Sequence, residues 1–247
     1  MVRFISVVFG CFLAASQTPS QSLEWKRSLN TTEHGYQVVD GQHPVRSGKT
    51  SERFEVRPGD CGVTATWNDC ENGKERSELR QASGLSKVGQ TYWYSWSIFV
   101  PNSTDDISPS GNILGQFHME DTYMPVLLFY YHKGYEVRFA QLRSEQFAPT
   151  LRLVDRYDFQ DKWHDIVMNI KWSTADDGFI KIWVNDEVKA DYSGKTNTES
   201  KDIYIKYGIY RSQLPRYKKK FRTNAPTQVV YFDNVQMGRT RDEVEIK

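Results

Sequence analysis

The chain has 247 residues, with 32 Lys and Arg against 31 Asp and Glu, a formal net charge of +1. Because basic and acidic residues are nearly equal in number, the chain has no overall electrostatic field that would attract nucleic acid or a membrane surface. We therefore expect neither partner. The length suits one large all-β domain better than two small ones.

Residues 1–16 resemble a secretory signal peptide, with Arg3 followed by an apolar run from Phe4 to Phe12 and then Ala14-Ala15-Ser16. The run is too short to span a bilayer, so the alternative of an uncleaved anchor is disfavoured. We therefore expect a secreted, extracellular protein whose residues 17–247 form a single domain. Removing the signal deletes one basic residue, and 32 minus 1 leaves 31 basic against 31 acidic residues.

Two cysteines, Cys61 and Cys70, remain once Cys11 leaves with the signal. A short, turn-rich stretch separates them, and an oxidising compartment favours a bond between them. A metal site would need more ligands of this kind. The pattern predicts a disulfide that closes a small loop.

Three segments alternate polar, reactive side chains with other residues at strand spacing: 76–80, 116–118 and 204–211. On a pleated strand, residues two apart share a face. The shared faces carry Arg76, Glu78 and Arg80; Gln116 and His118; and Lys206, Gly208 and Tyr210. Burying such faces as core would leave polar groups without partners, so we expect them to line an open groove for an anionic ligand.

Strand patterns recur from Tyr36 to the end of the chain. In residues 163–172, Ile166, Met168 and Ile170 share one face, and Asp165, Val167, Asn169 and Lys171 share the other. Asp176-Asp177-Gly178 predicts a turn into a second strand over 179–185. Further strands are predicted at 92–100, 125–131, 135–142 and 228–236, with a tight turn at 132–134. Many short strands with regular turns indicate an all-β jelly-roll sandwich of two antiparallel sheets.

The stretch 211–222 holds six basic residues and no acid. A solvated surface loop and a role in holding a polyanion are both compatible with this run.

Several chemistries lack their residues. Glycoside hydrolysis needs a matched pair of carboxylates, and the nearby Glu75 and Glu78 have opposite parity on the strand. The sequence also has no nucleophile elbow, no HExxH metal motif and no phosphate-binding glycine loop. A non-catalytic, lectin-like module that binds acidic glycans remains possible.

β-Elimination on a uronic acid polymer would use the observed residues. The reaction removes the proton beside the sugar carboxylate and expels the 4-linked oxygen, and donors aimed at the carboxylate stabilise the charge that develops there. Arg76, Gln116 and His118 are suitable donors, and Tyr210 is suited to moving protons.

The stereochemistry of the sugar assigns the base. In glucuronate or mannuronate the proton and the leaving oxygen lie on the same side, so Tyr210 could act as base and acid. Its phenol would need a depressed pKa, which Lys206 or Arg211 could provide. In guluronate or iduronate the two lie on opposite sides, and His118 would be the base with Tyr210 as acid.

These segments resemble the jelly-roll polysaccharide lyases, which include alginate, heparin and glucuronan lyases. Alginate lyases of this type carry Arg-(Ser/Thr)-Glu-Leu, Gln-(Ile/Val)-His and Tyr-Phe-Lys-Ala-Gly-Val-Tyr-Asn-Gln, which correspond here to 76–79, 116–118 and 204–213. The resemblance implies that Arg76, Gln116, His118 and Tyr210 are the catalytic residues. Phe117, Tyr207 and the Arg211-Ser212 pair depart from the alginate pattern.

The segments 163–167 and 231–235 look closer to the secreted glucuronan lyases of polysaccharide lyase family 20. We therefore expect cleavage of β-1,4-glucuronan, with an alginate or heparin-type substrate as the alternative. Glu78, Arg80, Lys206 and Arg211 would shape the groove or bind neighbouring sugar units.

The resemblance also implies a structural calcium ion, for which Asp233 is the candidate ligand, against the alternative that Asp233 hydrogen-bonds a turn. We expect no organic cofactor. The expected partner is an anionic polysaccharide, and we expect the protein to be a monomer.

Overall fold

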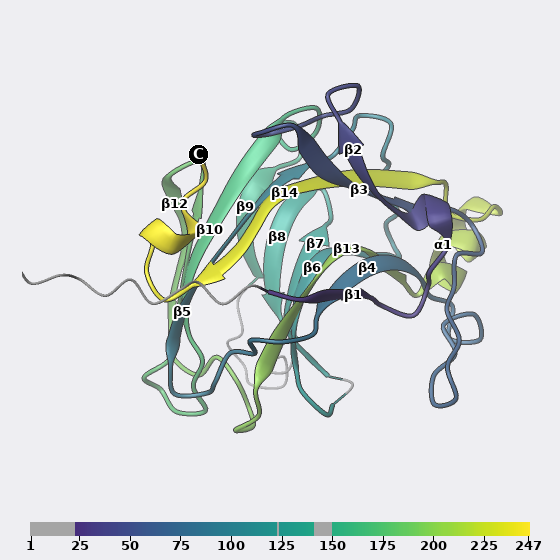
Figure 1. The fold of residues 1–247 in the computed structure, drawn as a ribbon. Coiled ribbons are helices and arrows are strands. Elements are labelled where there is room, and N and C mark those ends of the chain that lie inside the picture. The colour runs from purple at the N-terminus through teal and green to yellow at the C-terminus, as the bar shows by residue number, and fades with distance from the viewer. Residues whose placement is uncertain (1–22, 123, 141–149) are drawn as a thin grey trace, which may run out of the picture.

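A computed structural model describes residues 23–122, 124–140 and 150–247. Its strands form two antiparallel seven-stranded sheets, packed as two layers (Figure 1). This architecture confirms the predicted all-β jelly-roll sandwich. The proposed signal peptide lies outside the described residues, and the single-domain boundary at 17–247 stays a prediction.

The first sheet carries the three polar segments. Its strands, in spatial order, are β1 (Trp25–Arg27), β4 (Glu75–Gln81), β13 (Ile203–Ser212), β6 (Gly111–Met119), β7 (Pro125–Tyr131), β8 (Gly134–Phe139) and β9 (Thr150–Asp155).

The second sheet closes the sandwich. It contains, in spatial order, β12 (Glu187–Ser193), β11 (Phe179–Val184), β10 (Trp163–Lys171), β5 (Thr91–Phe99), β14 (Gln228–Gly238), β3 (Thr50–Val56) and β2 (Tyr36–Asp40). Short 3-10 helices lie at Glu33–Gly35 and Asp242–Val244. No helix in the described ranges has the length and apolarity needed to cross a bilayer.

Aromatic side chains from the two sheets interlock in the core. Phe117 of β6 lies 4.9 Å from Tyr94 of β5, measured between ring centroids, and Trp96 of β5 lies 4.9 Å from Phe129 of β7. Edge-on packing at this spacing is favourable for aromatic rings. On each strand, the side chains that point between the two sheets pack in the core. The side chains that point outward from the first sheet can therefore form a binding site.

The predicted hairpin is confirmed, since β10 and β11 pair antiparallel with Ile166 opposite Val184. The predicted tight turn is also confirmed, because β7 ends at Tyr131, β8 begins at Gly134, and the His132 N–H donates to the Gly134 carbonyl at 2.9 Å. The predicted strand 135–142 extends to residues outside the described part of the chain.

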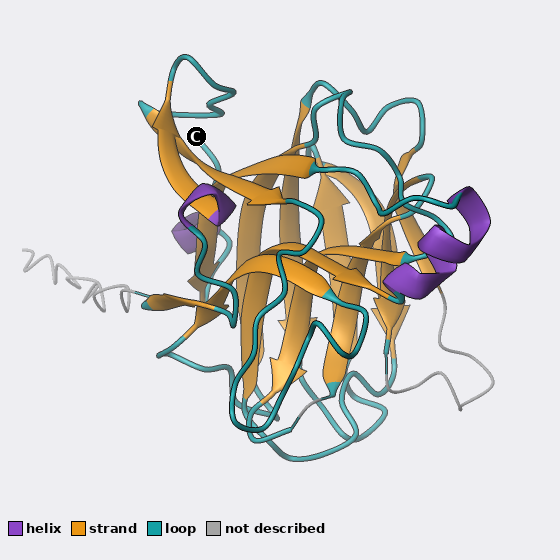
Figure 2. Cartoon of the chain, turned by 90° about the vertical axis from the view of Figure 1, so that its right-hand side faces the viewer, coloured by secondary structure: helices purple, strands orange, loops and turns teal. Residues whose placement is uncertain are grey.

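The stretch after β13 forms a helix rather than the surface loop considered above. α1 (Leu214–Phe221) begins with a proline in its first turn, a position where the missing N–H costs nothing. It projects from one end of the sandwich (Figure 2, purple).

Candidate functional site

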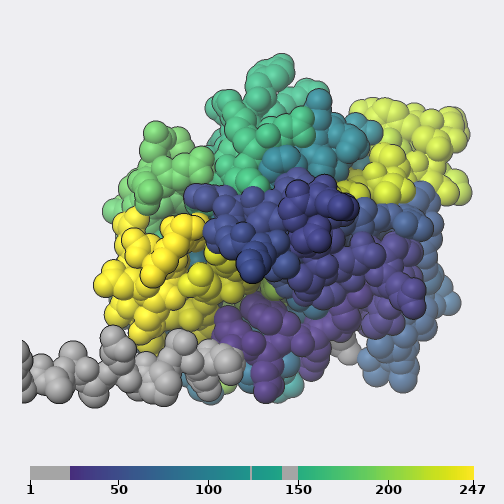
Figure 3. All heavy atoms as spheres, turned by 45° about the horizontal axis from the view of Figure 1, so that its top comes forward, coloured from purple at the N-terminus to yellow at the C-terminus, as the bar shows by residue number. Residues whose placement is uncertain are grey.

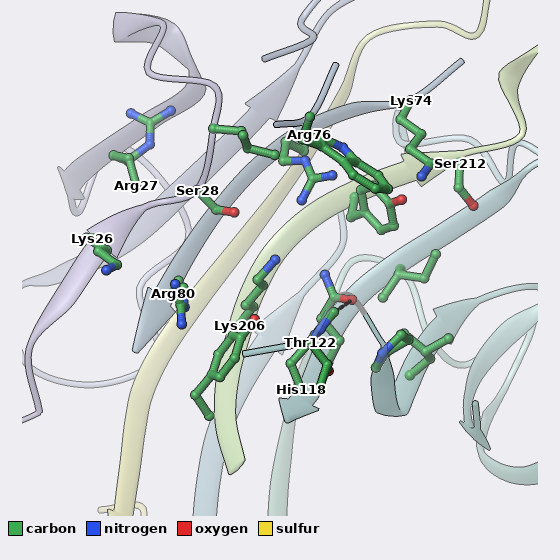
Figure 4. A pocket seen from close by; sticks show the side chains of 18 of the residues that line it. Lys26, Arg27, Ser28, Lys74, Arg76, Arg80, His118, Thr122, Lys206 and Ser212 are labelled. Atoms are coloured by element: carbon green, nitrogen blue, oxygen red, sulfur yellow. Dashed lines mark hydrogen bonds between the residues drawn. The ribbon is translucent and has the colours of Figure 1, made fainter. Parts of the chain in front are cut away.

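A groove of about 740 Å³ lies on the outward face of the first sheet. Side chains from five adjacent strands, β1, β4, β13, β6 and β7, line it together with residues of the connecting loops. In Figure 4, Arg76, Lys206 and His118 lie in the middle, with Lys26 and Arg27 on one side and Lys74 and Ser212 on the other. The lining cations are Lys26, Arg27, Lys74, Arg76, Arg80 and Lys206, against the acids Glu120 and Asp121.

Strand register brings the predicted catalytic residues together. Arg76 of β4 lies directly opposite Tyr210 of β13. On the other side of β13, Gln116 of β6 lies opposite Lys206, and His118 lies opposite Tyr204. Arg76, Gln116, His118 and Tyr210, which are up to 134 positions apart in the sequence (210 minus 76), therefore line one groove.

Gly208 shapes β13 between Lys206 and Tyr210. Its φ of 122° suits glycine, and a Cβ there would lie 2.3 Å from the Ser77 carbonyl oxygen. The pairing with β6 shifts register between Tyr207 and Tyr210, which is a β-bulge. The bulge changes the pairing register of β13 directly before Tyr210.

Two carboxylates hold the Arg76 guanidinium. Its Nε and Nη2 donate to the two oxygens of Asp69, each at 2.7 Å, and its Nη1 donates to Glu78 at 3.2 Å. Arg76 is 5% exposed and Asp69 is fully buried, so this bidentate pair is shielded from water. The side chain is fixed with its remaining N–H capacity beside the groove.

The predicted Cys61–Cys70 disulfide is confirmed. It closes the loop that presents Asp69 to Arg76 and places Trp67 in the lining of the groove. The bond limits how far this loop can move away from the sheet. It therefore supports the position of the Arg76 guanidinium indirectly.

A hydrogen-bonded chain fixes the protonation of His118. The Gln116 Nε2 donates to the Glu78 carboxylate, which orients the amide so that its Oε1 accepts from His118 Nε2 at 2.9 Å. The proton of a neutral imidazole then resides on Nε2, and Nδ1 carries the lone pair. Nδ1 is buried and has no hydrogen-bond partner among the described residues.

Burial first, and then Lys206, Arg76 and Arg80, hold the pKa of His118 well below its usual value. The imidazole is thus neutral at ordinary pH. The Tyr204 ring stacks on it, with centroids 5.4 Å apart and planes at 19°. The Arg80 guanidinium covers Tyr204 at 4.1 Å from the ring centroid.

The prediction of a depressed pKa for Tyr210 is wrong. Burial raises the pKa, with Glu78 and Asp69 adding to the rise, and the Arg76 cation 4.4 Å above the ring opposes it only in part. Neither Lys206 nor Arg211 supplies the expected depression. The Tyr210 phenol is therefore protonated and suited to donate.

Lys206 is a buried cation that lines the groove. It is 8% exposed, and burial followed by the neighbouring Arg76 and Arg80 cations lowers its pKa, while Glu78 opposes that effect. No carboxylate in the described ranges forms an ion pair with Lys206. By contrast, Arg80 Nη2 donates to both carboxylate oxygens of Glu120, each at 2.9 Å. The Lys206 ammonium is thus available to an anionic ligand.

Two predicted substrate-binding residues do not contact the groove. Glu78 is 2% exposed and lies beneath it, where it holds Arg76 and Gln116. Arg211 has the inward parity of β13 and is fully buried, with its guanidinium donating to Glu75 and to the Pro226 carbonyl. Glu78 is a positioning residue and Arg211 is a structural one.

Asp233 does not fit a calcium site. Its Oδ2 accepts from the backbone N–H groups of Arg46 and Ser47 at 3.0 and 3.1 Å, and its Oδ1 from that of Asn234 at 2.8 Å. The described residues hold no group of three or more His, Cys, Asp or Glu side chains placed to share a metal. Asp233 therefore satisfies turn backbone, and a calcium ion elsewhere stays a prediction for metal analysis to test.

Sequence reasoning did not identify Asp69, Tyr204 and Lys74 as parts of the site. Tyr204 shares parity with Lys206 and Tyr210, and that spacing could have revealed it. Asp69 and Lys74 lie in irregular chain, where no periodicity indicates which way a side chain points.

The hydrogen bonds that link Glu78, Gln116 and His118 lead to a prediction for a substitution of Glu78. In Glu78→Gln the neutral amide can donate as well as accept, so the Gln116 amide is free to turn over and the His118 proton to move to Nδ1. We expect kcat to fall about tenfold or more with a smaller change in KM. Nitrogen NMR of labelled histidine should show the Nε2–H tautomer in the parent protein and a mixture in the variant. A parent protein already protonated on Nδ1 would contradict the assignment.

Comparisons with known proteins agree with this geometry. A family profile described as polysaccharide lyase matches residues 20–236. A search of curated protein sequences gives no match.

Among solved structures, endo-β-1,4-glucuronan lyase from the fungus Trichoderma reesei superposes with a TM-score of 0.65 at 18% identity, covering 87% of this chain and 92% of that one. The family 7 alginate lyase A1-II′ gives a TM-score of 0.61 at 14% identity, covering 87% and 94%. A variant of the same alginate lyase, in complex with product, gives 0.60 at 14% identity, covering 87% and 95%. At these identities the likeness concerns the fold.

Proposed function

Because the chain belongs to the polysaccharide lyase family, we propose that it cleaves a polyuronate, β-1,4-glucuronan, by β-elimination. The protein is thus a lyase acting on a polysaccharide, and the proposal concerns which polymer and which residues. It rests on the chemistry of the groove and on the likeness to the fungal glucuronan lyase.

The observation that carries this proposal is the buried Lys206, which forms no ion pair with a carboxylate in the described ranges, in a groove that also presents Arg76. Glu78 offsets only part of the cost of burying this cation among other cations, and an entering carboxylate would offset more of it. A neutral sugar would offer no such compensation. The groove therefore favours a sugar acid.

The reaction needs charge stabilisation and proton movement. A base removes the proton on the carbon that bears the carboxylate, a carbon–carbon double bond forms, and the bond to the 4-linked oxygen breaks as that oxygen takes a proton. Arg76 and the second amide N–H of Gln116 would hold the carboxylate as negative charge develops on it. The single N–H of neutral His118 donates to Gln116 Oε1, so His118 would position that amide rather than donate to the sugar, unlike the role expected from the sequence. Tyr210, on the opposite strand, would transfer the protons.

In a glucuronate unit the proton and the leaving oxygen lie on one side, so Tyr210 serves first as a phenolate base and then as the acid. Its raised pKa makes the phenolate scarce at neutral pH but strongly basic. We therefore expect kcat/KM to rise with pH through the alkaline range, roughly tenfold per unit below the pKa of the phenol. A pH–rate profile on glucuronan measures this slope.

A second candidate, cleavage of guluronate or iduronate units, is favoured by one observation. Nδ1 of the neutral His118 has no hydrogen-bond partner among the described residues, so its lone pair could accept the proton while Tyr210 donates to the leaving oxygen. In that case kcat/KM would be flat from about pH 6.5 upwards, because His118 is already neutral there. A flat profile would contradict Tyr210 as the base.

Two of the three departures from the alginate motifs lie in the core rather than in the groove. Phe117 packs against Tyr94 and Trp172, and the Tyr207 hydroxyl donates to Glu52 at 2.7 Å. They therefore do not touch a bound sugar. Ser212 does line the groove, so it is the departure that can contribute to substrate choice.

The substrate is tested by incubating the mature protein with glucuronan, alginate, heparin and hyaluronan while following the ultraviolet absorbance of the unsaturated uronate end. We expect signal on glucuronan alone. Signal only on alginate or heparin would show that the polymer is a different one, while β-elimination as the reaction would be retained. Binding without signal on any polymer would overturn the proposed activity.

We propose in addition that the protein is secreted and monomeric. The motif at residues 1–16 supports secretion. N-terminal sequencing of protein recovered from the medium, with light scattering of the purified protein, tests both.

A further inference from the structure

The helix α1 carries a cluster of cations that the groove does not use. Arg216, Lys218, Lys219, Lys220 and the capping Arg222 lie within seven positions, and the segment from Arg211 to Gln228 contains no acid. In the described part of the chain none of these five forms an ion pair with a carboxylate, and Lys220 lies 4.9 Å above the Phe221 ring. On a chain with a formal net charge of only +1, this is a concentrated local positive potential.

The helix lies at the end of the groove. β13 runs past Tyr210 to Ser212, which still lines the groove, and α1 begins two residues later. The Leu214 N–H donates to the Gly73 carbonyl at 3.1 Å, and a Cβ on Gly73 would lie 2.6 Å from Pro215. These contacts join α1 to the chain that leads into β4. Figure 3 shows this region (yellow-green) projecting at the edge of the molecule.

A second cavity, of about 420 Å³, lies between α1 and the disulfide loop. Lys74 lines both this cavity and the catalytic groove, so the two are adjacent. Lys218 and Pro215 line it from the helix side. Its one lining acid, Glu75, is engaged by Arg211 and by the backbone N–H of Gly59 at 2.6 Å. The path from the groove to α1 is therefore bordered by two cations, Lys74, which lies 4.1 Å over the Trp67 ring, and Lys218.

We propose that α1 and this cavity form an accessory site for the same anionic polysaccharide, which continues from the groove past Lys74 onto the helix. The inference rests on the proposed polyuronate substrate for the identity of its ligand. When a polyanion binds to a row of cations, it releases its counterions, and this strengthens the binding of a long chain. A fragment that ends inside the groove does not reach the α1 cations, so its binding is not affected. The accessory site thus serves affinity for polymer rather than bond cleavage.

The test is the triple variant Lys218→Gln, Lys219→Gln and Lys220→Gln. These side chains are exposed on a surface helix, so the fold is expected to be retained. The matched control, Lys49→Gln, Lys181→Gln and Lys189→Gln, removes the same charge from the second sheet and the connection between β2 and β3. Both proteins are assayed on long glucuronan and on a purified disaccharide-to-tetrasaccharide fraction.

We expect the α1 variant to show a KM on polymer raised about fivefold, with unchanged kcat and unchanged kinetics on short fragments. The dependence of KM on salt should also become shallower, and the control should behave as the parent. Equal KM values for parent and variant on polymer would overturn the proposal, as would a matching loss in the control.

Gel electrophoresis through immobilised glucuronan, alginate or heparin provides a readout that does not require activity. Retardation that falls in the α1 variant but not in the control supports the site even if no polymer is cleaved. Cleavage of glucuronan with equal retardation of the parent and both variants would instead leave the proposed function standing and remove the accessory site.

Discussion

Replacing Tyr210 by Phe is expected to lower kcat on the cleaved polymer by about 10³-fold or more while polymer binding is retained. The change removes one hydroxyl group from a ring that stays under the Arg76 guanidinium, 4.4 Å from its centroid. In the pairing of β4 with β13 the residue opposite Arg76 is Tyr210, so the variant loses the phenol that lies beside the guanidinium. Ultraviolet assays give the rate, and electrophoresis through the polymer gives binding.

The matched control is Tyr130→Phe, which removes a hydroxyl group from another tyrosine that lines the same groove. Tyr130 lies on β7, opposite Ile113 rather than Arg76. We expect its kcat to stay within about tenfold of the parent. A Tyr210→Phe protein with parental kcat would remove the mechanism, even with the substrate correctly identified.

Asp69→Asn is expected to destabilise the protein by about 3 kcal/mol and to lower kcat about 10²-fold. Asp69 is fully buried and accepts two hydrogen bonds from Arg76, each 2.7 Å long. An asparagine keeps one acceptor and turns an N–H₂ group toward guanidinium donors, so the buried cation loses its bidentate partner. Urea unfolding measures the loss of stability, and kcat is measured where the variant is still folded.

Glu120→Gln provides the comparison, because it also removes a carboxylate from an arginine in the groove. The Arg80–Glu120 pair has side chains that are 27% and 34% exposed, so solvent screens it. We expect a stability change below about 1 kcal/mol. Equal stability losses in the two variants would show that burial does not distinguish these pairs.

Residue spacing alone was enough to predict which side chains share a face of a strand. Period-two spacing placed Arg76 with Arg80, Gln116 with His118 and Lys206 with Tyr210, because successive side chains of a strand point to opposite sides. The alternation also indicated the β10–β11 hairpin and the sandwich, and the spacing of Cys61 and Cys70 indicated their bond. These features are local, so a sequence displays them directly.

The same spacing could not show which residues each strand face contacts in the folded protein. Glu78 shares parity with Arg76 but is buried, because Arg76 of β4 and Gln116 of β6 both donate to its carboxylate. Arg211 adjoins Tyr210 but has the opposite parity, which takes it into a buried pair with Glu75. The basic run became a helix, since its proline starts a turn that packs on the chain before β4.

The protonation states of Tyr210 and His118 depend on how the chain folds around them. The pKa of Tyr210 is raised and that of His118 lowered, chiefly by burial, with charges contributed from other strands and from the loop that holds Asp69. Desolvation depends on how completely the surrounding chain excludes water, and charge effects depend on distances between residues remote in sequence. Strand periodicity contains neither quantity, so the residue types were predictable while their chemistry was not.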